Sequence, residues 1–505
     1  MKIIFIPLDE RPCNYKYPKM IAETRDDVEL LIPPYDIMGK KKTAANVEKV
    51  WDFIFENIHD CDAVVLSIET LLYGGLIPSR LHYLTKEKAN DLLDNIKKIK
   101  EINKDISVYA SNMIMRTPRY SSDDEEPDYY GICGLEIFQR AYYTDKKARV
   151  GISEEEQIIL DKAIKNVKQE YIDDYETRRE FNSMINGRIL ELVKEGSIDF
   201  LSITQDDSAR FGYTARDQQK VVKKLKEYKL WEKVMMYPGA DEVGCTLISR
   251  ALNHLLNREP EVYCFFSSTN GPMIIPNYED RPMNETLKSH ILAAGCKITE
   301  NLDNADFILA INSPGQKQEE APWQENKDVT YSSFRNLLDF SVRIKNYIKE
   351  GRPVVISDSA FSNGGDIELL QILDEMNVCD KLISYKGWNT NANTLGTTIA
   401  AGVYGFEKLK EDKIKENVLF HVLEDCMYQS IVRQYFVDHV LPKYDCSYGD
   451  LGDKTEIITK LIAEEMKEKF NALILKSFTG YNDVVLEVDS PCNRMFEIDL
   501  NIDVK

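Results

Sequence analysis

Two pairs of adjacent carboxylates stand directly after short apolar segments of the sequence. Asp206 and Asp207 follow FLSITQ, and Asp241 and Glu242 follow YPGA. Two carboxyl groups held close together push their pKa values apart, so that one stays protonated while the other is ionised. Cleavage of a glycosidic bond needs that division between an acid and a carboxylate. We therefore predict these four residues as the catalytic candidates.

Each acidic pair also has a structural interpretation. Asp207 would cap the following helix and Asp206 would pair with Arg210, because aspartate is a preferred N-cap residue. Asp241 and Glu242 would instead lie at the start of a helix over residues 242–256, where carboxylates complement the helix dipole. The sequence leaves both interpretations open.

Further polar residues follow other apolar runs and are predicted to bind the substrate. Asp9, Glu10 and Arg11 come after the first run, where they would bind a polyol or a carboxylate substrate. The alternative is that they satisfy one another as ion pairs. Trp388 and Asn389 suit a carbohydrate, since an indole offers a face for stacking and an amide binds hydroxyl groups; packing of Trp388 between domains is the alternative. The other predicted substrate-binding residues are Glu69, Arg80, Asn112 and Asp358.

The elements that position these residues are indicated by an alternation of short apolar runs with amphipathic segments. This alternation is typical of βα units whose parallel strands are buried on both faces. The carboxyl ends of such strands converge on the active site in barrels and in open sheets. Strands are predicted at 2–6, 28–32, 62–68, 106–111, 199–204, 233–237, 262–266, 305–312, 353–358 and 381–385.

The sequence predicts an α/β protein of three parts. Residues 1–260 are expected to form a (β/α) barrel-like catalytic domain, although the same pattern also fits an open doubly wound sheet. Residues 261–405 are expected to form a flavodoxin-like α/β domain. Residues 406–505 are expected to form a mostly helical C-terminal cap, and the alternation of apolar and charged residues in MFEIDL predicts a terminal β-hairpin.

One long segment interrupts the alternation. More than 80 residues separate the strand ending near Asn112 from the next strand, and they begin with the acidic, turn-rich RYSSDDEEPDYYGICG. Ser153 and Glu156 have the spacing of a capping box at the start of a helix. A connection of this length beside a strand end is typical of a lid or a substrate wall, and a disordered surface insertion is the alternative.

Charge and composition exclude several classes of partner. Asp and Glu number 84 against 64 Lys and Arg, which gives a formal net charge of -20 and opposes binding to nucleic acid. No stretch approaches the roughly 20 apolar residues that cross a bilayer. Ten cysteines without a C-x-x-C pair indicate reduced thiols and a cytoplasmic location. A small-molecule substrate is expected, and a homo-oligomer is compatible with the sequence.

Cofactor and metal motifs are missing from the sequence. The six histidines are dispersed without the spacing of a zinc site. Glycine-rich motifs that bind nucleotides are absent too. We therefore predict no cofactor and no metal, although carboxylate ligands of Mg²⁺ or Mn²⁺ leave no spacing signature.

Six motifs in order resemble a bacterial family, the domain of unknown function 4127 family of PLDERP-type proteins, over nearly the whole chain to about residue 410. The motifs are PLDERPCN, LLYGGLIPSR, QDDSARFG, PGADEVG, SDSAFSNGGD and GWNTNANTLGT. This resemblance implies no particular activity.

A weaker likeness concerns the active site. A strand followed by two aspartates is similar to O-GlcNAc hydrolase-type hexosaminidases, which implies that Asp206 orients a 2-acetamido group and Asp207 is the general acid. The Asp241–Glu242 pair is similar to the chitobiase-type arrangement, which implies that Glu242 is the acid instead.

These observations predict a glycoside hydrolase for a small glycoside, with N-acetylhexosaminides as one substrate class and paired carboxylates as acid and base. A divalent-metal-dependent hydrolase or lyase would use the same carboxylates as ligands. A non-catalytic sugar-binding protein is the third hypothesis.

Overall fold

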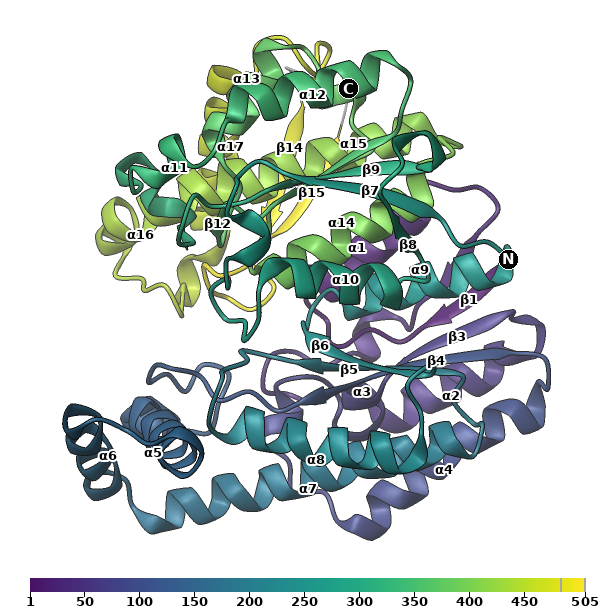
Figure 1. Ribbon diagram of the computed structural model, residues 1–505, viewed down its shortest axis with the longest axis vertical. Helices are drawn as coiled ribbons and strands as arrows, with labels where there is room; N and C mark the ends of the chain where they lie inside the picture. Colours follow the sequence, from purple (N-terminus) through teal and green to yellow (C-terminus); the bar gives the residue numbers. More distant parts are fainter. Residues whose placement is uncertain (482–483, 504–505) are drawn as a thin grey trace. The chain divides into compact units, whose positions relative to one another are not determined.

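The computed structural model describes residues 1–481 and 484–503. The chain divides into two compact units, and each unit is built around its own main sheet (Figure 1). Unit 1 consists of Met1–Glu10, Leu30–Leu247 and Tyr278–Asp280. Unit 2 consists of Arg11–Glu29, Ile248–Asn277 and Arg281–Lys505. Along the chain the change from unit 1 to unit 2 in this region comes after Leu247, and the three-part division expected from the sequence stays a prediction.

The sheet of unit 1 has six strands in the order β2-β1-β3-β4-β5-β6, and the pairs from β1 to β6 are parallel. All six lie at or within two or three residues of the predicted positions. The strands are β1 (Lys2–Phe5), β2 (Glu29–Leu31), β3 (Ala63–Ser67), β4 (Ser107–Ile114), β5 (Phe200–Gln205) and β6 (Val234–Pro238).

The predicted α/β class is confirmed, and the barrel-like closure expected for residues 1–260 is corrected to an open sheet. The chain places β2 on one side of β1 and then β3 on the other side, so the direction of growth reverses once. A barrel needs successive strands added on the same side until the last meets the first. The reversal leaves β2 and β6 at opposite edges, as in a doubly wound sheet.

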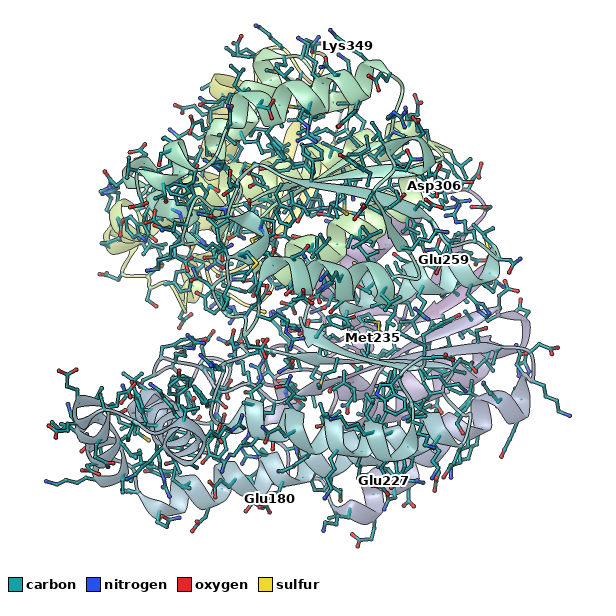
Figure 2. All side chains as sticks on the ribbon, in the orientation of Figure 1. Glu180, Glu227, Met235, Glu259, Asp306 and Lys349 are labelled. Carbon is teal, nitrogen blue, oxygen red and sulfur yellow. The ribbon has the colours of Figure 1, made fainter. Side chains whose placement is uncertain are left out.

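Helices of unit 1 bury apolar residues against the sheet. Residues from β3, β4 and β5 share one core with Ile189 and Leu190 of α7 and with Leu225 of α8, while Glu180 and Glu227 on the same helices point outward (Figure 2). Burial on both faces explains why the strand sequences are continuously apolar. The helices are α2 (Val47–Asn57), α3 (Ile68–Tyr73), α4 (Lys86–Ile102), α5 (Tyr130–Val150), α6 (Glu154–Asn166), α7 (Gln169–Lys194), α8 (Tyr213–Tyr228) and α9 (Val243–Leu255), which continues into unit 2, with short 3-10 turns at Tyr35–Ile37, Ile58–Asp60 and Pro78–Arg80.

The long connection between β4 and β5 is helical. It begins with an acidic loop, residues 115–129, and continues through α5, α6 and α7. The predicted capping box is confirmed: Ser153 Oγ accepts from Glu156 N at 3.2 Å, and Glu156 Oε2 accepts from Ser153 N at 3.0 Å. These paired bonds fix the start of α6 because they satisfy backbone donors that a helix terminus leaves open.

The main sheet of unit 2 has the order β13-β11-β9-β7-β8, with parallel pairs throughout. Counted from β7, this is the flavodoxin order 2-1-3-4-5, so the flavodoxin-like prediction is confirmed. The sequence pattern missed β8, because its three residues are largely exposed and make no apolar run. The strands are β7 (Glu261–Phe266), β8 (Lys297–Thr299), β9 (Phe307–Asn312), β11 (Val354–Asp358) and β13 (Ser384–Lys386), with a two-stranded ribbon of β10 (Glu319–Glu320) and β12 (Phe361–Ser362) beside them.

Helices cover both faces of this second sheet. In Figure 1, α12 and α13 lie on one face and α10 and α14 lie on the other. The helices of unit 2 are α1 (Pro12–Ala22), α10 (Met283–Ala293), α11 (Thr330–Ser333), α12 (Leu337–Lys349), α13 (Ile367–Glu375), α14 (Asn391–Gly405), α15 (Glu411–His421), the π-helix η8 (Val422–Val432), α16 (Arg433–His439) and α17 (Thr455–Leu473); 3-10 turns lie at Gly271–Met273, Leu302–Asn304, Ala321–Asn326, Cys379–Lys381, Leu441–Tyr444 and Gly452–Lys454.

The predicted C-terminal hairpin is confirmed, but its second strand begins later in the chain than the MFEIDL segment indicated. β14 (Val485–Asp489) pairs antiparallel with β15 (Asp499–Asp503). The residues between them form a longer loop, which is held by the buried Arg494–Glu497 ion pair at 2.8 Å and by Ser490, whose hydroxyl donates to Arg494 O. The loop therefore takes up part of the segment whose alternation predicted a strand.

Candidate active site

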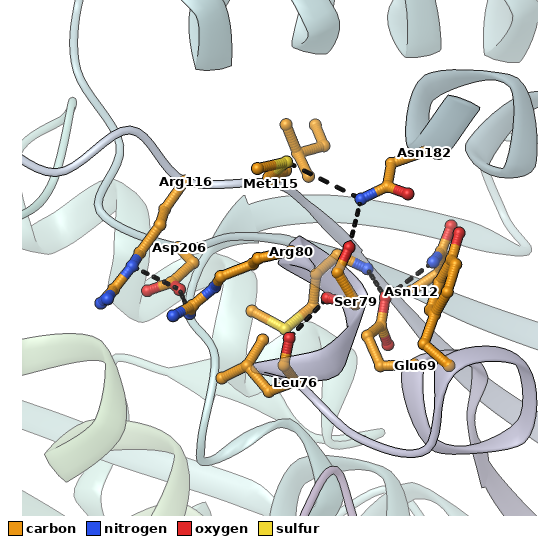
Figure 3. Close-up of a pocket in the computed structure, with 12 residues that line it drawn as sticks. Glu69, Leu76, Ser79, Arg80, Asn112, Met115, Arg116, Asn182 and Asp206 are labelled. Carbon is orange, nitrogen blue, oxygen red and sulfur yellow. Dashed lines mark hydrogen bonds and ion pairs between the residues drawn. The ribbon is translucent and has the colours of Figure 1, made fainter. Parts of the chain in front are cut away.

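Three neighbouring strands of unit 1 bring predicted site residues to one edge of the sheet. β3, β4 and β5 are adjacent and parallel, with Ser67 opposite Ser111 and Ile114 opposite Gln205. Glu69 follows β3 in the first turn of α3, Asn112 lies near the end of β4, and Asp206 follows β5. Parallel strands that end together place these side chains around a common pocket (Figure 3).

Arg80 lies at the centre of this edge and holds one of the predicted aspartates. Its Nη2 donates to Asp206 Oδ2 at 2.8 Å, and its Nη1 lies 3.2 Å from Glu125 Oε2 and 3.4 Å from Glu126 Oε1. The guanidinium is almost completely buried. Burial of a charged group is favourable only when it is paired in this way.

A second guanidinium, Arg116, completes the cluster. Its Nε donates to Glu126 Oε1 at 2.8 Å, and its Nη2 donates to Glu125 Oε2 at 2.9 Å. It also lies 3.5 Å from Asp207 Oδ2 and 4.0 Å from Asp206 Oδ2. Two guanidiniums thus face four carboxylates, and the site carries an excess of negative charge.

The helix α7 holds the backbone that carries Arg116. Arg179 Nη1 and the Tyr175 hydroxyl both donate to Arg116 O, at 2.8 and 2.9 Å. Arg179 is itself paired with Asp217 at 2.8 Å. A charged and a neutral donor on one carbonyl oxygen fix the position of the loop after β4.

Arg116, Glu125 and Glu126 were not predicted as site residues from the sequence. Two signals pointed toward them: Arg116 comes soon after a strand, and the glutamates lie in the acidic segment predicted as a lid or wall. Their pairing depends on the path of the loop at 115–129, which no local pattern specifies. The structure shows that the start of this segment is a wall of the site.

Asp207 differs from an ordinary aspartate in the pKa of its carboxyl group and in its backbone conformation. Burial, followed by the negative charge of Asp206, raises the pKa of Asp207 to about 7, while Arg116 and Arg80 act in the opposite direction. Its φ of 42° is a backbone conformation that L-residues rarely adopt and that tends to occur at functional sites. Its side chain keeps 18% of its surface exposed, so it can exchange a proton with solvent.

The helix-capping interpretation of this pair does not describe the structure. Gly212 is the N-cap of α8, without a side-chain cap. Asp206 pairs with Arg80, whereas Arg210 lies over the ring of Phe211 at 5.4 Å.

The raised pKa of Asp207 predicts a pH-dependent effect on stability. Between about pH 4 and pH 7 the folded protein holds a proton that the unfolded chain has released, so unfolding free energy falls as pH rises. Asp207→Asn has no carboxyl group to ionise, so the loss of unfolding free energy with rising pH should disappear. We expect this variant to raise the unfolding free energy in urea by roughly 1 to 3 kcal/mol at pH 8, with little gain at pH 4. Equal destabilisation at both pH values would contradict the assignment.

Glu69 is a second carboxyl group with a perturbed pKa. Burial raises it to about 7, against the hydrogen bonds that favour the ionised form. Its Oε1 accepts from Asn112 Nδ2 and from Met113 N, both at 2.8 Å. Its Oε2 and the buried hydroxyl of Tyr73 have no hydrogen-bond partner among residues 1–481 and 484–503.

These groups surround a cavity of about 10 Å³, which is room for about one water molecule. Asn112 is held in turn by Asn186 of α7, whose Nδ2 donates to Asn112 Oδ1 at 2.5 Å. The residues that line the cavity are Glu69, Tyr73, Leu76, Ser79, Arg80, Asn112, Met113, Ile114, Met115, Arg116, Asn182 and Asp206.

The second acidic pair lies outside this lining. Asp241 and Glu242 are buried immediately before α9, and Glu242 Oε2 accepts from Ala240 N at 2.9 Å. This arrangement corresponds to the helix-start interpretation.

The predicted residues after β1 are also buried outside the cavity lining. Glu10 Oε1 accepts from Lys41 N at 2.6 Å, which ties the end of β1 to a loop of unit 1. Arg11 is the N-cap residue of α1 and belongs to unit 2, whereas Asp9 belongs to unit 1.

Three more predicted substrate-binding residues, besides Arg11, lie in unit 2. Asp358 is fully buried and accepts from Asn312 Nδ2 at 2.8 Å and from the Tyr385 hydroxyl at 2.5 Å. Trp388 is only 5% exposed, and its ring packs edge-on at 6.3 Å from that of Tyr17. Asn389 is half-buried with a φ of 61°, a conformation that asparagine tolerates better than most residues. The structure therefore gathers Glu69, Arg80, Asn112 and Asp206 at one pocket, with Asp207 beside them.

Two further features bear on the predicted classes. In the part of the chain that the structure describes, His, Cys, Asp and Glu form no group of three or more arranged to hold a metal ion. None of its described helices combines the length and apolar character needed to cross a membrane.

The chain belongs to the family described as protein of unknown function (DUF4127), whose family model matches residues 3–501. The match confirms the resemblance of the six motifs and extends it through the C-terminal region. Comparison with curated proteins gave no match.

Proposed function

We propose that this protein is a glycoside hydrolase that uses Asp207 as its general acid. The observation that carries the proposal is the state of Asp207, whose pKa is raised to about 7 next to a second carboxylate. At neutral pH a large share of Asp207 keeps its proton, which an ordinary aspartate has lost. A protonated carboxyl group that can reach solvent is able to donate to the leaving oxygen of a glycosidic bond.

The charge of the site supports the same reaction. Carboxylates outnumber guanidiniums in the cluster, so a substrate that develops positive charge is favoured over an anionic one. Glycoside hydrolysis passes through an oxocarbenium-like transition state with such a charge. Asp206, fixed by Arg80 at 2.8 Å, is the carboxylate placed to stabilise it.

The finer parts of the proposal concern substrate and location. An N-acetylhexosaminide is the first substrate class to test. A cytoplasmic location is proposed because Cys264, Cys296 and Cys379 are free thiols whose pKa burial raises to about 12, as suits inert thiols in a reducing compartment.

The test is a panel of nitrophenyl glycosides, N-acetylhexosaminides included, incubated with the full-length protein with and without a chelator. We expect release of nitrophenol from at least one glycoside, unchanged by the chelator. Release that the chelator abolishes and Mg²⁺ or Mn²⁺ restores would favour the metal-dependent hypothesis. If no glycoside is cleaved while calorimetry detects sugar binding, the sugar-binding hypothesis replaces this one.

A further inference from the structure

We propose that Glu69 is the general base of this reaction, and that it activates a water molecule held in the cavity beside it. The inference rests on the proposed glycoside hydrolase function and specifies its stereochemistry. A water that attacks directly from a base displaces the leaving group in one step, so the product has the opposite anomeric configuration to the substrate.

The geometry of Glu69 suits a base better than a structural carboxylate. Two donors, Asn112 Nδ2 and Met113 N, bind the same oxygen, Oε1. They fix the carboxyl group and leave Oε2 without a partner among the described residues. A buried polar oxygen left in this way is costly unless something binds there.

The cavity has room for a water molecule that would bind this oxygen. Its volume of about 10 Å³ matches one water molecule, and a buried water usually needs two or more polar partners. Glu69 Oε2 accepts one hydrogen bond from such a water, and the Tyr73 hydroxyl, also without a partner in the described residues, provides a second. Both side chains line the cavity.

Asp206 is less suited to be the base. Its Oδ2 is already engaged by Arg80 at 2.8 Å, so proton removal from water would compete with that ion pair. Asp206 nevertheless lines the same cavity as Glu69, and Asp207 is its neighbour in the chain. The cavity therefore connects the proposed base to the two-aspartate end of the site.

The chemical step balances with the groups named. The water oxygen bonds to the anomeric carbon as the glycosidic carbon–oxygen bond breaks. One water proton goes to Glu69 Oε2, and the leaving oxygen takes the proton of Asp207. Exchange with solvent then returns the proton from Glu69 and restores the one on Asp207.

The proposal gives a characteristic pH profile. The charged or titratable groups that share the cavity with Glu69 are Arg80, Arg116, Asp206 and Tyr73. Burial of Glu69 outweighs the effect of the hydrogen bonds to its carboxyl group and raises its pKa to about 7. The reaction needs this group ionised and Asp207 protonated, and both pKa values are about 7. We expect a narrow bell for kcat/KM, centred near pH 7, on a glycoside whose leaving group needs protonation, and the acidic limb alone on a nitrophenyl glycoside.

The experiment compares Glu69→Gln with the unchanged protein on the nitrophenyl glycoside that the panel shows to be cleaved most rapidly. We expect kcat to fall by about 10² to 10⁴-fold and the acidic limb of the pH profile to disappear. In a Glu69→Ala variant, whose shorter side chain leaves room for it, sodium azide, a nucleophile that needs no base, should restore turnover and yield a glycosyl azide of inverted configuration. Proton NMR of the first-formed sugar from the unchanged protein should also show inversion.

One control variant and one further test variant accompany Glu69→Gln. Glu497→Gln makes the same chemical change at an equally buried position of unit 2, beside Arg494, and should lower stability without lowering kcat. Tyr73→Phe removes one partner of the water and should lower kcat by about tenfold with the fold intact.

The outcomes separate the two proposals. Retained configuration, or a Glu69→Gln variant as active as Glu497→Gln, overturns the role of Glu69 and leaves Asp207 as the acid. If Glu69→Gln does not fold, the anomer formed by the unchanged protein and the Tyr73→Phe result decide. A panel with no cleaved glycoside overturns both proposals.

Discussion

Asp207→Asn is expected to lower kcat/KM by about 10² to 10⁴-fold on a glycoside with an alkyl or sugar leaving group. Asparagine keeps the shape of the side chain and its contacts near Arg116, which lies 3.5 Å from Oδ2, but it has no acidic proton to donate. The loss should be much smaller on a nitrophenyl glycoside, because nitrophenolate leaves without protonation. Kinetics on the two kinds of substrate measure this difference.

The pH profile provides the second half of this prediction. Asp207 must hold its proton to act, and burial together with Asp206 raises its pKa to about 7. The alkaline limb of kcat/KM should therefore lie near pH 7 in the unchanged protein and vanish in Asp207→Asn. Asp374→Asn, the same change at a buried aspartate of unit 2, should keep the limb. An Asp207→Asn variant with an unaltered profile and an equal loss on both substrates would show that Asp207 is not the acid.

The convergence of Glu69, Asn112 and Asp206 was predictable because it follows from strand order. Each residue stands at the end of an apolar run, and the ends of parallel strands share an edge. β3, β4 and β5 proved to be neighbours, so the three side chains line one pocket. The sequence indicates which residues follow strands, and the parallel arrangement of those strands brings the residues to one edge.

The choice between the two acidic pairs was not predictable in the same way. Asp241 and Glu242 also follow a strand, yet the Glu242 carboxylate accepts a backbone N–H from Ala240 two residues earlier. Asp206 instead meets Arg80, which is 126 positions away in the chain. Local sequence patterns describe neighbours along the chain, whereas a long-range guanidinium partner depends on the complete path of the loops.

The strand ends of unit 2 show a related limit. Asp358 and Trp388 follow strands as Asp206 does, but the π-helix η8 packs on this region within unit 2. Its Asp425 Oδ2 accepts from Gly387 N at 2.7 Å, and its Cys426 Sγ lies 3.1 Å from the Tyr385 hydroxyl. Polar residues at a strand end can thus satisfy a covering helix as well as a ligand, and the residue types alone do not distinguish these roles.

The buried ion pair at this edge of unit 2 gives the largest expected effect on stability. The side chains of Arg335 and Asp366 are both fully buried, and Arg335 Nη1 lies 2.5 Å from Asp366 Oδ2. Asp366 also caps α13 by accepting from Glu368 N at 3.1 Å. Arg335→Met leaves the Asp366 carboxylate without its cation in a site closed to water, and we expect a loss of about 3 to 5 kcal/mol of unfolding free energy. Urea unfolding followed by circular dichroism measures it.

The double variant Arg335→Met with Asp366→Asn tests why stability is lost. Asparagine removes the unpaired charge and still caps the helix, so much of the loss should be recovered, because a buried ion pair replaced as a whole costs far less than one that is broken. Lys460→Met, which breaks an exposed pair with Glu456, should leave the unfolding midpoint unchanged. If the double variant is as unstable as the sum of its single changes, lost packing accounts for the effect, and the charge on Asp366 does not.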